Sequence, residues 1–150
     1  MNVESLLRSC GVDFDVLEHD TAYTAEQTAE SLHVPQGHFA KTVVLNVDGS
    51  RILAVIPASR LIDLELVRRE MGAMNVQLVG EEEFRLLFPD CELGAIPPFG
   101  SEYELETIVD DELGLGEHIV FDGNNHRRAI YMRYRDFLRI EHPRMAHIAN

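Results

Sequence analysis

The chain has 150 residues, of which 45% are hydrophobic and 26% are charged, and its net charge is −13. This balance is typical of one globular domain with a buried core, and the apolar runs fall short of the roughly 20 residues that a membrane span needs. The acidity excludes a protein that coats a nucleic-acid backbone with a broad basic surface. We therefore expect neither a membrane nor DNA as a partner.

Apolar periodicity and turn residues predict alternating helices and strands along the chain. In chain order, the predicted elements are a helix (2–10), a strand (14–19), a helix (24–32), two strands (41–47 and 51–58), a helix (62–71), a strand (75–79), a helix (81–88), three strands (104–111, 118–123 and 129–134) and a helix (135–140). Residues 89–100 are expected to form a loop and residues 141–150 a tail. The predicted class is a single mixed α/β domain over residues 1–150 with a partly antiparallel sheet.

Specific residues support several of these boundaries. Thr24 and Gln27 form a capping box that opens the second helix. Gly11 and Gly72 are suited to end the helices before them. The turn at residues 48–50 joins two β-branched strands and predicts an antiparallel hairpin.

Several common functional motifs are missing. Cys10 and Cys91 are too few for a disulfide framework and fit no metal spacing. The histidines form no H-E-x-x-H pattern, and His142 and His147 lie five apart, off one helical face, so no metal site is expected. No nucleophile elbow or phosphate-binding glycine loop is present. The N-terminus lacks the order of a secretory signal, and we expect a cytoplasmic protein.

Lys41 is the only lysine in the chain, since the other twelve basic residues are arginine. An ammonium is a compact charge that enters narrow pockets where a guanidinium does not fit. Its position at the start of an apolar strand therefore makes it a candidate functional residue. The alternative is a surface lysine without a role.

The loop "GAIPPFG", residues 94–100, places two prolines between two glycines. Pro97 is held extended by Pro98, and prolines donate no backbone N–H. The amides of Gly94, Ala95 and Ile96 can instead be presented to a carbonyl oxygen. A plain connecting loop is the alternative interpretation.

Three motifs in order resemble the YbaK family of bacterial editing domains associated with prolyl-tRNA synthetase. They are "FAKTVVL" with Lys41, "GAIPPFG" with a G-x-x-x-P pattern from Gly94 to Pro98, and "HIVFDG" with Asp122 and Gly123. The resemblance covers nearly the whole chain. It implies a mixed sheet that curls around a pocket with helices outside, and no metal or organic cofactor.

The implied activity is trans-editing, in which the ester between a wrong amino acid and the 3′-terminal adenosine of tRNA is hydrolysed. Lys41 and Gly94 match the family's functional lysine and loop glycine and become the expected catalytic residues. The expected substrate-binding residues from the matching motifs are Ala95, Ile96, Pro97, Pro98, Asp122 and Gly123. The chain departs from relatives at Asp122, where several have a small residue, and at Thr42, where some have asparagine. Both departures leave the amino acid open.

A pocket for the wrong amino acid also needs walls. Thr21, Tyr23 and Thr42, together with Ile96 and Pro97, are expected to line it. His19 is expected to form a wall or to carry protons, with a structural role as the alternative.

The expected partner is the aminoacylated CCA end of tRNA, together with an aminoacyl-tRNA synthetase or elongation factor that supplies further grip on the tRNA. Two other functions remain open from the sequence. One is a module that binds an amino acid or aminoacyl group without turnover. The other is a protein that docks on a synthetase through its acidic surface.

Overall fold

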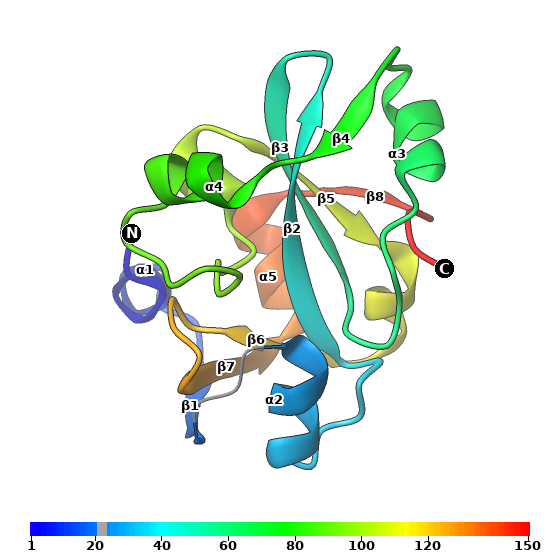
Figure 1. Ribbon diagram of the computed structural model, residues 1–150. Helices are drawn as coiled ribbons and strands as arrows, with labels where there is room; N and C mark the ends of the chain where they lie inside the picture. Colours follow the sequence, from blue (N-terminus) through cyan, green and yellow to red (C-terminus); the bar gives the residue numbers. More distant parts are fainter. Residues whose placement is uncertain (21–23) are drawn as a thin grey trace.

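The structure is a computed structural model that describes residues 1–20 and 24–150 (Figure 1). Its helices are α1 (Val3–Ser9), α2 (Ala25–Ser31), α3 (Leu64–Met71), α4 (Glu81–Leu87) and α5 (Tyr134–Glu141), with short 3₁₀ helices η1 (Gly100–Tyr103) and η2 (Asp111–Leu115). Its strands are β1 (Phe14–Glu18), β2 (Phe39–Val47), β3 (Ser50–Pro57), β4 (Val76–Leu78), β5 (Glu106–Asp110), β6 (His118–Asp122), β7 (Arg128–Arg133) and β8 (Arg144–Ala146).

The strands form one mixed sheet in the order β1-β7-β6-β2-β3-β5-β8, with β4 paired to β2. The β1–β7, β6–β7, β2–β3 and β2–β4 pairs are antiparallel. The β2–β6, β3–β5 and β5–β8 pairs are parallel. The predicted mixed α/β class with a partly antiparallel sheet is confirmed. Over the described residues, none of the helices has the length and apolar character that a membrane crossing requires.

Local sequence explains where the helices begin and end. The Thr24 side chain accepts a hydrogen bond from the Gln27 amide at 3.0 Å, which confirms Thr24 as the N-cap of α2. Gly72 closes α3 in the left-handed conformation with φ of 62°, and Gly11 follows α1 with φ of 69°. These positions suit glycine because it has no Cβ to clash there.

The C-terminal tail was wrongly predicted to lack regular structure. It forms β8, which runs parallel to β5, and the Asp110 carboxylate accepts hydrogen bonds from the amides of Ile148 and Ala149 at 2.8 and 3.1 Å. A three-residue strand that depends on a partner far away in the chain leaves no local pattern to read. The 3₁₀ helices η1 and η2 were also missed, and β2 begins at Phe39, two residues earlier than predicted.

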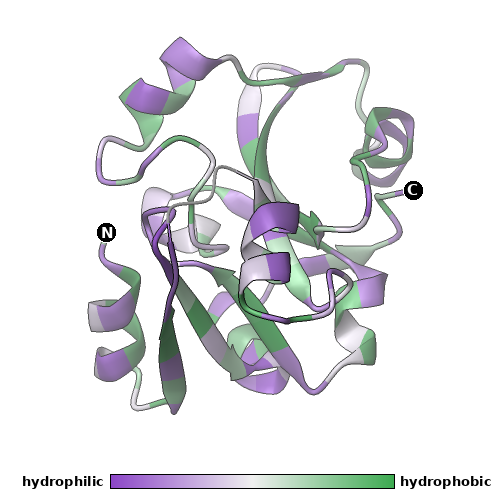
Figure 2. Cartoon of the chain, turned by 60° about the horizontal axis from the view of Figure 1, so that its bottom comes forward, coloured by the Kyte–Doolittle hydropathy of each residue, from purple (hydrophilic) through white to green (hydrophobic). Residues whose placement is uncertain are grey.

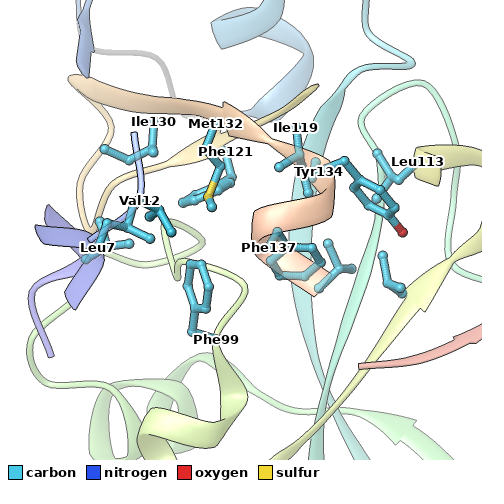
Figure 3. Packing of buried hydrophobic residues seen from close by; sticks show 14 residues of the cluster. Leu7, Val12, Phe99, Leu113, Ile119, Phe121, Ile130, Met132, Tyr134 and Phe137 are labelled. Atoms are coloured by element: carbon cyan, nitrogen blue, oxygen red, sulfur yellow. The ribbon is translucent and has the colours of Figure 1, made fainter. Parts of the chain in front are cut away.

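Helices cover both faces of the sheet. The core residues of α1 and α5 pack on one face, and those of α2 and α3 pack on the other. Figure 2 shows the hydropathy pattern that fits this packing. The helices carry both hydrophilic and hydrophobic stripes, while strands in the middle of the sheet are largely hydrophobic. Figure 3 shows Phe99 pointing from its loop into the core between α1 and α5. Its ring lies 5.7 Å from that of Phe121 and 5.5 Å from that of Phe137.

Strand β2 has one continuous edge and one divided edge. It pairs with β3 from Ala40 to Val47. Its other edge pairs with β6 only at Phe39 and Ala40, and with β4 only from Leu45 to Val47. Between these two partners, residues 41–43 face no strand within the described part of the chain. We call this opening the β2 gap.

The loop after α4 is anchored at Gly100, where the chain passes close to the start of β5. The Gly100 amide donates to the Thr107 hydroxyl at 3.0 Å, and that hydroxyl donates to the buried Glu141 carboxylate at 2.6 Å. A Cβ at Gly100 would lie 2.5 Å from the Thr107 hydroxyl oxygen and 2.7 Å from the Leu105 carbonyl oxygen. Any side chain at this position would therefore push the loop away from β5.

Gly100→Ala is expected to lower the free energy of unfolding by about 1–3 kcal/mol, because the added methyl group collides with backbone. Thermal unfolding should show the change as a drop of several degrees. Gly37→Ala is the matched control, because a Cβ there meets no atom within 4 Å. Equal melting temperatures for the two variants would contradict the steric argument.

Candidate functional site

Lys41 lies at the β2 gap and points to the face of the sheet that α2 covers. Phe39, two residues earlier on the same face, packs with Ala25 and Ala29 of α2. The Lys41 side chain is 22% exposed, and its Nζ donates to Glu26 Oε1 at 3.0 Å. The only lysine is thus half-buried and paired, which distinguishes it from a free surface lysine.

Glu26 was not singled out from the sequence, although it holds the lysine. The Thr24 cap places it in the first turn of α2. Burial alone would raise the pKa of the Glu26 carboxyl, but its own backbone amide and the Lys41 ammonium outweigh this effect and hold the pKa below its usual range. In the sequence, an acid at this position is explained by the helix dipole, so the fifteen-residue link to Lys41 is not visible.

Thr42 points to the opposite face of β2. It is buried, and its hydroxyl oxygen has no hydrogen-bond partner among the residues that the structure describes. The next side chain on the same face is Val44, which belongs to the same hydrophobic cluster as Ile96. Thr42 is therefore on the loop side of the sheet, whereas Lys41 is on the α2 side.

The loop from Gly94 to Pro98 changes from exposed to buried along its length. Gly94 is exposed and has φ of +80°, while Ala95, Ile96, Pro97 and Pro98 are buried. The Ala95 amide already donates to the Glu92 carbonyl at 3.0 Å. The prediction that all three amides face a ligand is therefore wrong for Ala95. Within the described chain, the amides of Gly94 and Ile96 donate no hydrogen bond and remain available.

The loop is tied to the turn that follows β6. The His126 ring places Nε2 2.5 Å from the Leu93 carbonyl oxygen, and the His126 amide donates to the Glu92 carboxylate at 3.3 Å. The Glu92 amide donates to the Asn124 carbonyl at 2.9 Å. Ile96 belongs to the same hydrophobic cluster as Val44, at one end of the β2 gap. The bonds of His126 and Asn124 tie the start of the loop to the turn after β6, the strand that pairs with β2 at the other end. The loop thus spans the gap.

Asp122 ends β6 on the α2 side of the sheet, the same side as Lys41. It is buried, and its Oδ1 finds no hydrogen bond within residues 1–20 and 24–150. Burial and the nearby Glu92 carboxylate raise the pKa of Asp122 to about 7. His126 Nδ1 lies 3.9 Å from Asp122 Oδ2. A carboxyl with this pKa can exchange a proton near neutral pH.

Gly123 and His19 lie near this turn. The Gly123 amide donates to the Arg128 carbonyl at 2.8 Å, and the His19 amide donates to the Arg127 carbonyl at 2.9 Å. The His19 ring places Nδ1 2.7 Å from the Asp20 carbonyl oxygen.

Two of the expected wall residues, Thr21 and Tyr23, lie outside the described residues. His126 and Glu92 were not expected from the sequence. The only signal for His126 in the sequence is its position three residues after Gly123, and no sequence feature singles out Glu92. No group of three or more His, Cys, Asp or Glu side chains suited to hold a metal occurs in the described part of the chain.

Comparison with known proteins identifies a family. The sequence model of the aminoacyl-tRNA editing domain matches residues 19–140. The multifunctional Ser/Thr-tRNA deacylase ProXp-y of Escherichia coli K12 is 28% identical over 146 residues, covering 94% of this chain and 87% of that protein. A proline–tRNA ligase of Bacillus cytotoxicus is 28% identical over 85 residues, covering 57% of this chain but only 15% of the ligase.

A solved structure gives the same fold. It is described as a candidate trans-editing enzyme for prolyl-tRNA synthetase and superposes with a TM-score of 0.87 at 21% identity, covering 99% of this chain and 94% of the other. The expected curled α/β fold of the editing domains is thereby confirmed.

Asp122→Asn is expected to flatten the dependence of stability on pH. Because the pKa of Asp122 is higher in the folded than in the unfolded chain, its contribution is present below about pH 4 and is lost as pH rises through about 7. The wild-type protein should lose up to about 4 kcal/mol over this range from this group. Denaturant unfolding at a series of pH values measures it.

Asp15→Asn controls for the change in net charge, because it removes an exposed aspartate on β1. If Asp122→Asn and Asp15→Asn change the pH profile equally, Asp122 does not have the raised pKa.

Proposed function

The chain belongs to the aminoacyl-tRNA editing domain family, and on that basis we propose that it hydrolyses the ester between a wrongly attached amino acid and the 3′-terminal adenosine of tRNA. The family match over residues 19–140 carries this proposal. Two observations support the proposal: Lys41 lies in the β2 gap, and the Gly94 loop shares a hydrophobic cluster with Val44 and is bonded to the turn after β6. A relative named as a Ser/Thr-tRNA deacylase is consistent with it.

The chemistry requires little from the protein. An aminoacyl ester is already activated, so a positioned water and a site for the developing oxyanion suffice, and orientation alone can contribute several kcal/mol. The available amides of Gly94 and Ile96 are the donors for that oxyanion. The substrate's own 2′-hydroxyl can activate the water, so the mechanism needs no strong protein nucleophile.

Lys41 holds the terminal phosphate or a hydroxyl of the adenosine in this proposal. Its present partner Glu26 is 40% exposed, and ion pairs of this kind contribute about 0–1 kcal/mol. A phosphate can therefore displace the glutamate at low cost. Glu26 keeps the ammonium at the rim of the gap until the substrate arrives.

The side chain of the amino acid needs a pocket of its own beside the ester. We assign this pocket to Thr42, Ile96 and Pro97, with Thr21, Tyr23 and His19 as further candidates. The buried Thr42 hydroxyl lacks a partner among the described residues and suits a substrate with a side-chain hydroxyl. A site that hydrogen-bonds a hydroxyl discriminates strongly against analogues without it. We infer seryl- and threonyl-tRNA as the preferred substrates.

The net charge of −13 limits the grip on tRNA. Few basic residues are available for phosphate contacts, so the protein holds the CCA end and little more. We propose that a synthetase or elongation factor in the cytoplasm supplies the rest of the tRNA contact. A module that binds the aminoacyl group without turnover is the competing function.

Lys41→Ala is expected to lower the deacylation rate of mischarged tRNA by about 100-fold or more, because the substrate loses its anchor. Lys41→Arg keeps the charge but not the shape and should recover little. Measuring both variants against a full panel of aminoacyl-tRNAs tests the activity and names the amino acid. Thermal unfolding should shift by only a few degrees.

A wild-type protein that hydrolyses nothing in the panel would remove the enzyme proposal in favour of the binding module. Unfolding of Lys41→Ala would instead mean that Lys41 is structural.

Thr42→Val is expected to lower kcat/KM for seryl- and threonyl-tRNA by about 10- to 100-fold without loss of stability, because the hydroxyl it removes is buried and unpaired among the described residues. Thr107→Val is the control, since the Thr107 hydroxyl is bonded to Gly100 and Glu141. That variant should lose stability. Unchanged selectivity in Thr42→Val would exclude Thr42 from the pocket.

A further inference from the structure

We propose that His126 is a positioning residue that orients the peptide between Leu93 and Gly94, so that the Gly94 amide points at the substrate. This inference rests on the proposed function, in which that amide stabilises the oxyanion. His126 itself acts through the loop and touches no reacting atom. Neither the sequence motifs nor the family match assigned it a role.

The hydrogen bond fixes the tautomer of the ring. The His126 Nε2 lies 2.5 Å from the Leu93 carbonyl oxygen. A carbonyl oxygen can only accept, so Nε2 must carry the proton and donate it. The bond ties the ring directly to a carbonyl group of the loop.

The same bond sets the direction of the Gly94 amide. The Leu93 carbonyl and the Gly94 N–H are the two ends of one planar trans peptide, and they point in opposite directions. When the ring holds the carbonyl, the N–H is turned away from the ring. Because it donates to none of the described residues, it is free for a ligand.

The ring is itself held from several directions. The His126 side chain is only 6% exposed, and its Nδ1 lies 3.9 Å from Asp122 Oδ2. Its backbone amide donates to the Glu92 carboxylate at 3.3 Å. On the loop side, the Cβ position of Gly94 lies 3.8 Å from His126 Cε1. A buried ring with these contacts is a rigid support for the peptide.

The loop needs such a support at this point. Gly94 is exposed, has φ of +80°, and has the conformational freedom of glycine. The Ala95 amide is fixed by the Glu92 carbonyl, but that bond leaves the peptide before Gly94 free to rotate. Rotation of that peptide would turn the amide away from the substrate. A donor that points elsewhere when substrate binds is lost to catalysis.

The kinetic test compares His126→Leu with His126→Gln. Leucine fills the space without a donor, and glutamine offers an N–H at a similar reach. We expect His126→Leu to lower kcat for deacylation by about 100-fold with KM nearly unchanged, and His126→Gln to recover most of the loss. Equal activities in the two variants, or a change confined to KM, would overturn the proposal.

Asn125→Ala is the matched control in the same turn. The Asn125 side chain accepts from the amides of Arg127 and Arg128 and has no hydrogen bond to the loop. The Asn125→Ala variant should keep kcat close to that of the wild type, even if the turn is weakened. A loss as large as that of His126→Leu would mean that turn stability, and not orientation of the Gly94 amide, explains the effect.

Nuclear magnetic resonance of the free protein tests the geometry without any substrate. A long-range proton–nitrogen spectrum should show the His126 proton on Nε2, and the Gly94 amide should give one sharp signal that broadens or splits in His126→Leu. A proton on Nδ1 alone, or a Gly94 signal unchanged in His126→Leu, would overturn the proposal. If the wild type deacylates nothing, the proposed function fails, and these spectra still decide whether His126 orients the peptide.

Discussion

The divided edge of β2 is the constraint on which the site depends. One strand serves three neighbours, because β3 takes one edge while β6 and β4 share the other. Strand β6 pairs with the beginning of β2 and β4 pairs with its end, so the two leave a gap between them on this edge. The intervening residues carry Lys41 to one face and Thr42 to the other. A single opening in the sheet thus presents a cation and a hydroxyl from adjacent positions.

The loop over this gap is assembled from contacts of different kinds. Phe99 fixes its end in the core through aromatic packing, and Gly100 lets it approach β5. His126 and Asn124 hold its beginning through hydrogen bonds. Between these anchors the loop presents the Gly94 amide. This arrangement also buries polar groups, of which Asp122 is the clearest example. Burial disfavours its charged form and so raises the pKa of its carboxyl.

Much of this architecture could be predicted from the sequence, and the reasons for the failures are physical. Strong periodicity, caps such as Thr24 and end glycines such as Gly72 gave the helices and most strands, because these signals are local. The family motifs indicated Lys41 and the Gly94 loop. Strand β8 could not be predicted, because it forms by pairing with β5 from a distant part of the chain. Likewise, Glu26 and His126 acquire their roles only through contacts that folding creates.

The prolines of the loop have a consequence for the behaviour of the protein in a crowded cell. An unpaired strand edge is a template on which strands of other molecules can add, and such edges promote aggregation. The loop that spans the β2 gap carries Pro97 and Pro98, which have no N–H to offer an incoming strand. The β2 gap can therefore stay open in the sheet while it resists the growth of an intermolecular sheet.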